Sequence, residues 1–156
     1  MNDWIANMEG DAKNRERENE IEAHRIKTLN ALAPVIWERV YAQVQRDIER
    51  LQGIRTLRFI KLIFHNFRVR RVDAYPHVEL LAEFLEGAVL KLVYSYKATS
   101  TTPTVNWSEV VLIKAAENDW NLTCGTETFL DEREASRFLL RPLSDTRFTP
   151  PENASI

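Results

Sequence analysis

The sequence predicts an α+β protein: an N-terminal long helix, kinked near Pro34, packed on an antiparallel β-sheet of about five strands, with a short C-terminal helix. Three observations support this fold class. Apolar residues recur at helical spacing in the first third of the chain, strand-like runs rich in β-branched and aromatic residues follow, and a helix-capping pattern begins at Asp131. We divide the 156 residues into a charged N-terminal segment (1–19), one domain (20–143) and a loose C-terminal tail (144–156).

The long helix is predicted by apolar residues that recur every three or four positions between Ile21 and Leu51. They are Ile26, Leu29, Ala33, Ile36, Trp37, Val40, Val44, Ile48 and Leu51. Because Pro34 removes a backbone hydrogen bond, we expect the helix to kink or restart there. An unbroken helix from residue 21 to 52 would be about 48 Å long, whereas a compact domain of this size is about 40 Å across. The helix therefore either breaks at Pro34 or overhangs, and residues 1–19 either extend it or fray.

The strands follow from Ile54, and their first stretch, 54–72, is dense in β-branched and aromatic residues. The next two strands are predicted at 78–85 and 88–96, which would form a hairpin around Glu86-Gly87. The first of these two segments also has good helix propensity, so a helix there is the alternative.

The remaining strands are predicted at 107–115, 120–123 and 127–130, the last two being short. The closing helix has Asp131 as its N-cap and Glu134 three residues later, where the carboxylate can reach back to the cap. Its apolar face consists of Ala135, Phe138 and Leu139, and we expect Pro142 to end it.

Motifs for catalysis, cofactors or metals are not found, so no catalytic, cofactor-binding or metal-ligating residue is predicted. The four glycines stand alone, which excludes a glycine-rich phosphate loop. The histidines lack metal-ligand spacing, although a site assembled from His65, His77 and Glu79 is an alternative. Cys124 could be a nucleophile, but a structural role is the preferred interpretation.

The composition also bears on location and environment. The single cysteine excludes an internal disulfide. No apolar run is long enough to span a membrane, and the first residues lack the basic group of a secretory signal. We therefore expect a cytoplasmic protein with no membrane partner.

The charge is concentrated in one basic stretch, because residues 53–72 carry six basic and no acidic side chains while the chain as a whole has a net charge of −2. The basic residues are Arg55, Arg58, Lys61, Arg68, Arg70 and Arg71. With Phe59, Phe64 and Phe67 between them, they could hold phosphates and stack bases. The preferred interpretation is ion pairing with Glu79 and Glu83 on a neighbouring strand, so nucleic acid is not the expected partner.

Two functions from different classes remain open beside this polyanion-binding alternative. We expect a non-enzymatic protein that binds a protein partner or associates with itself, because the apolar helix positions before Pro34 need a surface that the sheet is too short to supply. A second copy of the chain is the simplest supplier. The alternative is a small-ligand-binding protein or enzyme with a pocket between sheet and helix. Its candidate lining residues are Tyr94, Tyr96, Trp107 and Trp120.

Overall fold

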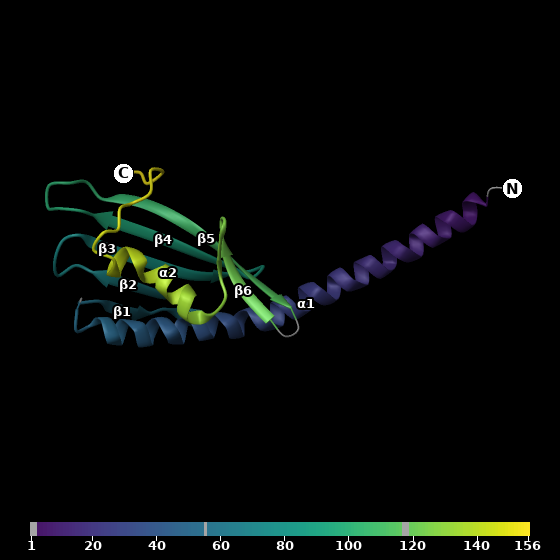
Figure 1. The fold of residues 1–156 in the computed structure, drawn as a ribbon, viewed down its shortest axis with the longest axis horizontal. Helices are drawn as coiled ribbons and strands as arrows, with labels where there is room; N and C mark the ends of the chain where they lie inside the picture. The colour runs from purple at the N-terminus through teal and green to yellow at the C-terminus, as the bar shows by residue number, and fades with distance from the viewer. Residues whose placement is uncertain (1–2, 55, 117–118) are drawn as a thin grey trace.

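A computed structural model describes residues 3–54, 56–116 and 119–156, and it confirms the α+β class (Figure 1). A long helix, α1 (Trp4–Leu51), is followed by a seven-stranded sheet and then by a short helix, α2 (Glu132–Ser144). Every neighbouring pair of strands is antiparallel, and the strand order follows the chain order from β1 to β7. The strands are β1 (Arg58–Lys61), β2 (Phe67–Arg71), β3 (His77–Leu85), β4 (Val89–Lys97), β5 (Val105–Ala116), β6 (Asp119–Cys124) and β7 (Glu127–Phe129).

The sheet has seven strands rather than about five, partly because the stretch 54–72 contains two strands instead of one. A single turn of 3₁₀-helix, Ile63–His65, separates β1 from β2. Phe64 and His65 there have φ values of 56° and 60°, which lie in the left-handed region that residues with a Cβ rarely adopt. This conformation reverses the chain, so β1 pairs with β2 as an edge hairpin.

The hairpin predicted around Glu86-Gly87 is confirmed, and residues 78–85 are strand rather than helix. β3 and β4 pair along nine residues, with Leu85 opposite Val89 at the turn. Gly87 has a φ of 78°, which a glycine adopts at little cost, and Ala88 after it is also left-handed. Along β3, the buried residues Val78, Leu80 and Ala82 alternate with less buried ones, which fixes the face that packs on the helices.

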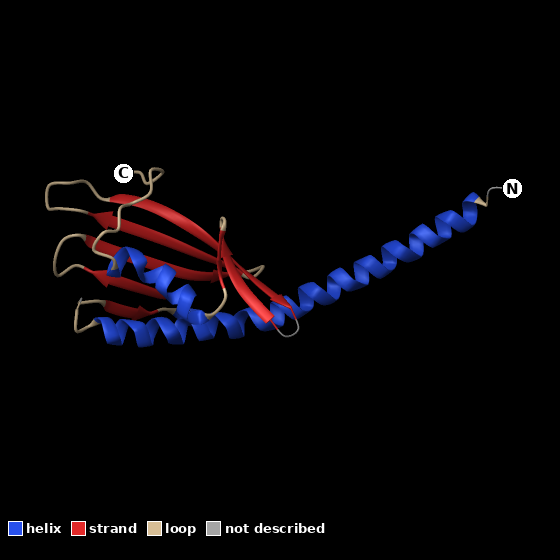
Figure 2. Cartoon of the chain, in the orientation of Figure 1, coloured by secondary structure: helices blue, strands red, loops and turns tan. Residues whose placement is uncertain are grey.

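The core lies between the sheet and the two helices, which cover the same face of the sheet (Figure 2). Trp37, Val40, Val44 and Ile48 of α1 are at most 3% exposed, as the helical spacing predicted. The ring of Trp37 stacks on Phe67 of β2 with 5.5 Å between ring centres. This contact between α1 and the sheet places the stripe of the helix against the sheet.

α1 continues through Pro34 without a break, so the overhang alternative is the one that the structure adopts. The 48 residues of α1 make it about 72 Å long at 1.5 Å per residue. The axis bends where the helix reaches the domain, and the part before the bend projects away from the sheet (Figure 1). All residues from 4 to 27 are exposed.

α2 begins at the predicted N-cap, because Asp131 Oδ1 accepts a 2.9 Å hydrogen bond from the backbone N–H of Glu134. The Glu134 carboxylate accepts from the N–H of Leu130, one residue before the cap. The prediction that Pro142 ends the helix is wrong, since α2 continues to Ser144. After α2, Phe148 stacks on Trp107 at 5.7 Å, and the backbones of Ser155 and Asn106 form a β-bridge.

Within the described ranges, no helix is both long enough and apolar enough to cross a membrane.

Candidate functional site

The basic stretch lies on the edge strands β1 and β2, and part of it is ion-paired. Arg68 Nε lies 2.9 Å from Glu79 Oε1, and Arg70 Nε lies 3.4 Å from Glu79 Oε2. Both arginines alternate along β2 with the buried residues Phe67 and Val69, so they lie on the face opposite the core. Each side chain is 41% exposed, and exposed ion pairs of this kind contribute at most about 1 kcal/mol each.

The structure separates the cations of this stretch from most of its aromatic rings. Phe59 and Phe67 stack on each other and contact Tyr41 of α1 on the core side. Phe64 is 81% exposed in the turn between β1 and β2. Arg58 is exposed on the edge strand β1, as is Lys61, while Arg71 ends β2. Arg55 lies outside the described residues.

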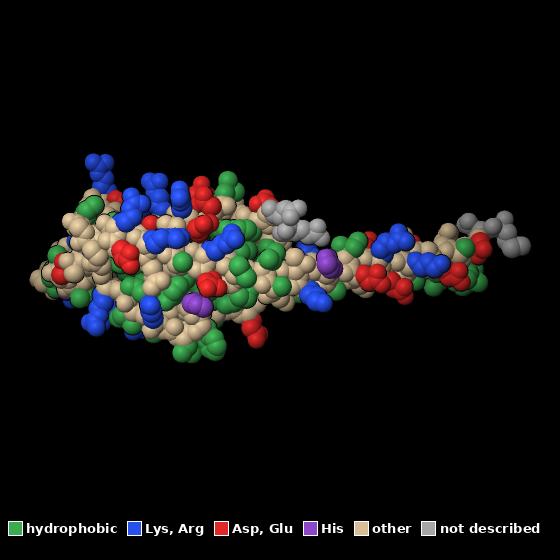
Figure 3. Space-filling model, turned by 90° about the horizontal axis from the view of Figure 1, so that it is seen from below, with side chains coloured by type: hydrophobic (Ala, Val, Ile, Leu, Met, Phe, Trp, Pro, Cys, Tyr) green, Lys and Arg blue, Asp and Glu red, His purple; other side chains and the backbone are tan. Residues whose placement is uncertain are grey.

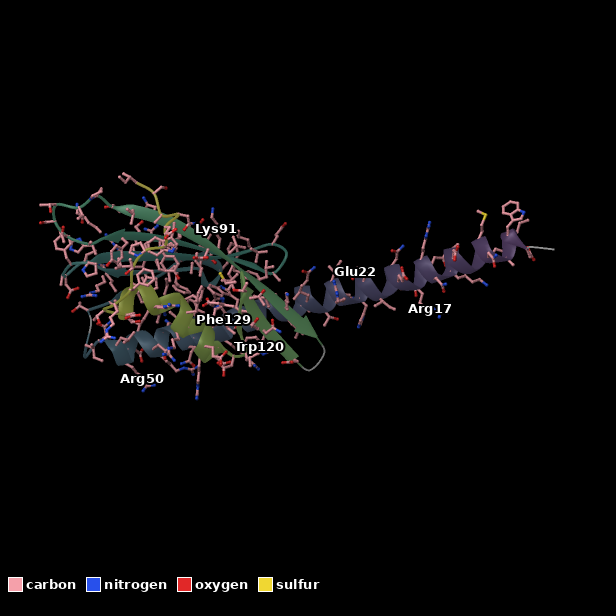
Figure 4. All side chains as sticks on the ribbon, turned by 45° about the horizontal axis from the view of Figure 1, so that its top comes forward. Arg17, Glu22, Arg50, Lys91, Trp120 and Phe129 are labelled. Carbon is pink, nitrogen blue, oxygen red and sulfur yellow. The ribbon has the colours of Figure 1, made fainter. Side chains whose placement is uncertain are left out.

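Two of the four predicted pocket residues share a cavity, and the other two do not line it. Tyr94 and Trp107 stack with 5.0 Å between ring centres and line a cavity of about 210 Å³ between the sheet, α2 and the C-terminal segment. Tyr96 lies next to it through its contact with Phe148. Trp120 lies on β6, nearer the projecting part of α1 (Figure 4).

The Tyr94 hydroxyl, which lines this cavity, already has a hydrogen-bond partner within the fold. The Tyr94 hydroxyl donates a 2.9 Å hydrogen bond to the Leu139 carbonyl of α2. Burial, followed by the negative charge of Glu109, raises the pKa of Tyr94 well above its usual value. The volume is also smaller than the roughly 300–1,000 Å³ of most small-molecule pockets.

Cys124 lies near the same end of the sheet, where its thiol donates a 3.4 Å hydrogen bond to Glu109 Oε2. Burial and then this hydrogen bond raise the pKa of Cys124 to about 11. The thiol is therefore protonated at neutral pH, whereas nucleophilic catalysis requires the thiolate. His65 makes an edge-to-face contact with Tyr41, and His77 stacks on Tyr75. In the described part of the chain, His, Cys, Asp and Glu side chains form no group of three arranged to hold a metal ion.

The projecting half of α1, which we call the arm (residues 4–29), exposes apolar side chains over most of its length. Trp4 is 64% exposed, and Met8 and Ile26 are similarly open. At 100° per residue these three positions fall on one stripe of the helix, and Leu29 continues that stripe to the buried Ala33. Figure 4 shows the arm projecting away from the domain, and at its root Leu29 packs against the core.

A groove between α1 and α2 was not anticipated from the sequence. It has a volume of about 840 Å³, and we call it the arginine groove because four of its lining residues are arginines. They are Arg46, Arg50, Arg133 and Arg137. Figure 3, viewed from the side on which α1 lies, shows Lys and Arg side chains gathered on part of the domain, whereas both signs of charge alternate along the arm. The four-residue spacing within each helix was visible in the sequence, but the closeness of the two helices was not.

The described residues thus present an uncovered arm, a small aromatic cavity and an arginine-lined groove. The chain matches no protein-family model, no curated protein and no solved structure.

Proposed function

We propose that the protein is a non-enzymatic cytoplasmic protein that works by self-association, with the arm as its dimerisation element. The observation that carries this proposal is one side of α1, which is buried under the sheet from Ala33 onward and bears the uncovered apolar residues Trp4, Met8 and Ile26 on the arm. The proposed cytoplasmic location rests on the single cysteine, because proteins of oxidising compartments commonly carry disulfides.

The arm has little to stabilise it as an isolated helix. In proteins, most helical stability comes from the packing of an amphipathic face rather than from intrinsic propensity. Among the described residues of the arm, the one side-chain ion pair is Arg25–Glu22, at 3.0 Å. Gly10, in the helix interior, costs about 0.5–1 kcal/mol relative to alanine. A partner along the stripe would supply the missing packing.

A second copy fits the stripe when two arms lie antiparallel about Arg17. Residues whose numbers add to 34 then face each other, so Met8 meets Ile26 and Ile5 meets Leu29. The apolar residues near the N-terminus of each arm then cover the apolar residues near the domain end of the other arm. Asp11 of one copy also lies beside Arg25 of the other, which adds an attraction across the edge of the contact.

A parallel arrangement would be less favourable because identical residues would face each other. Arg15 would meet Arg15, and Glu22 would meet Glu22, near the centre of the contact. In the antiparallel arrangement the same positions pair Arg15 with Asn19 and Glu22 with Ala12. Like charges held opposite each other are destabilising, so the antiparallel dimer is the proposed form.

Sedimentation equilibrium over a micromolar concentration range tests the proposal. The chain should sediment at twice its 18.2 kDa, about 36 kDa. The double variant Ile26→Asp and Leu29→Asp should sediment as a monomer, because two carboxylates would be buried in the contact. Ile21→Asp is the matched control: Ile21 is exposed but lies on another face of the helix, so this variant should remain dimeric. A monomeric wild-type protein, or a dimer that survives the double substitution, would overturn the proposal.

A further inference from the structure

We propose that the arginine groove binds a small phosphate ester that carries an apolar or ring-shaped group. The four arginines come from two helices that lie against each other, with Arg46 and Arg50 on α1 and Arg133 and Arg137 on α2. Each wall of the groove therefore contributes two arginines to its lining. Guanidinium groups bind phosphate oxygens through two parallel hydrogen bonds, which makes arginine the preferred residue for such ligands.

The two arginines on each helix repel each other, and a bound anion would relieve this repulsion. Arg46 and Arg50 are four residues apart on one helix, as are Arg133 and Arg137 on the other. Like charges at this spacing destabilise a helix by about 0.2–0.5 kcal/mol per pair. Within the described residues, none of the four forms an ion pair.

The acidic side chains in the groove do not neutralise this charge. The lining has four arginines against Asp47 and Glu132, which leaves two positive charges in excess. Both carboxylate oxygens of Asp47 already accept hydrogen bonds, one from Gln43 and one from Ser136. Gln43 also accepts a 3.1 Å hydrogen bond from Arg46, so this arginine is oriented before any ligand arrives.

Apolar side chains in the groove indicate that the ligand is more than a bare anion. Leu51, Ile54 and Leu140 line the groove beside the arginines, and Ile54 is 71% exposed. Exposed apolar surface next to a concentration of positive charge matches a molecule with one anionic and one apolar part. A volume of about 840 Å³ lies within the range of small-molecule sites.

A small ligand is favoured over nucleic acid because the positively charged surface does not continue across α2. On the other side of α2 a second hollow is lined by Glu127, Glu134 and Asp145 together with Arg137 and Arg141. A polyanion extending from the groove across α2 would meet these carboxylates. The rest of the chain is also acidic, since the net charge is −2 despite the arginines.

Isothermal titration calorimetry with 1-naphthyl phosphate tests the proposal. Wild-type protein should bind it saturably, with a dissociation constant below about 1 mM. The variant Arg50→Gln with Arg137→Gln, which removes one charge from each wall, should bind at least tenfold more weakly. The control variant Arg39→Gln with Arg147→Gln removes two exposed arginines outside the lining and should keep wild-type affinity.

Two further titrations separate the parts of the proposal. Ile54→Ser should weaken the binding of 1-naphthyl phosphate but leave the binding of inorganic pyrophosphate unchanged. Only the first ligand has an apolar ring that can contact the apolar side chains of the groove. A single-stranded oligonucleotide should bind no more tightly than pyrophosphate. The proposal is overturned if wild-type protein does not bind 1-naphthyl phosphate, if both double variants bind equally, if Ile54→Ser has no selective effect, or if the oligonucleotide binds most tightly through these arginines. Because all substituted arginines are exposed, unchanged thermal unfolding should accompany each result.

Discussion

The hydroxyl of Ser136 on α2 donates a 2.6 Å hydrogen bond to Oδ2 of Asp47 on α1, which joins residues 89 positions apart in the chain. Ser136 is fully buried, and the other oxygen of Asp47 accepts a 2.9 Å hydrogen bond from Gln43. The bond therefore fixes the second helix against the first. Because the arginine groove lies between these helices, the same bond sets the separation of its two walls.

Replacing Ser136 with alanine should lower the free energy of unfolding by about 1.5–3 kcal/mol, as expected for a hydrogen bond to a charged acceptor. Urea denaturation followed by circular dichroism measures this change. Ser144→Ala is the control, because the Ser144 hydroxyl donates only to the Leu140 carbonyl of its own helix. If the two substitutions lowered the free energy of unfolding equally, the bond between the helices would contribute no more than a bond within one helix.

Trp37→Ala should destabilise the domain by about 3–5 kcal/mol, because it removes the largest α1 side chain from the core and leaves a cavity. Trp4→Ala, the same change on the exposed arm, should alter the free energy of unfolding by no more than about 0.5 kcal/mol. Urea denaturation at a protein concentration low enough to keep the chain monomeric compares the two. A loss below 1 kcal/mol at Trp37 would contradict the packing of α1 on the sheet.

Cysteine cross-linking should reveal the direction in which two arms pair. In a Cys124→Ser background, the chain with both Met8→Cys and Ile26→Cys should oxidise readily to a covalent dimer, because antiparallel arms bring the two positions together. Met8→Cys alone should not, since its two copies would lie about 27 Å apart along the helix axis, beyond the reach of a disulfide. Non-reducing electrophoresis gives the result. Rapid dimer formation by Met8→Cys alone would indicate parallel arms instead.

Cys124 should react with iodoacetamide much more slowly in the folded protein than in the urea-unfolded chain. At pH 8, a thiol with a pKa of about 11 has a thiolate fraction on the order of 0.001, roughly a few hundredfold below that of an ordinary thiol. Glu109→Gln should speed the reaction, because the negative charge of Glu109 contributes to the raised pKa. Mass spectrometry across pH 8–11 follows the rate. Equal rates in the folded and unfolded protein would contradict the burial of the Cys124 thiol beside Glu109.

The raised pKa of Cys124 also predicts how the free energy of unfolding changes at high pH. A folded-state pKa above the unfolded one favours folding at pH values where the thiol stays protonated, and this contribution is lost as the pH rises toward 11. The folded protein should therefore lose stability between about pH 9 and pH 11. Cys124→Ala should make that loss shallower, as measured by urea denaturation at several pH values. An identical pH dependence in the variant would assign the loss to other groups, such as Tyr94.

The sequence alone determined the features that arise within a few residues of one another. The three-to-four spacing from Ile26 to Leu51 predicted the buried face of α1, because a helix places such residues on one side whatever they pack against. Asp131 predicted the start of α2, and Gly87 predicted the hairpin between β3 and β4, because capping and turn formation depend on local backbone chemistry.

Tertiary structure decided what depends on residues far apart in the chain. The reversal at Phe64 and His65 splits one expected strand into two, and residues with a Cβ give no local signal for a left-handed backbone. The passage of α1 through Pro34 depends on packing against the sheet, which outweighs the local preference to break there. The arginine groove exists because two helices far apart in the chain pack side by side, joined by the hydrogen bond between Ser136 and Asp47. Local periodicity fixes which face of an element is buried, but contacts over such separations decide which elements meet, and so which charged side chains share a site.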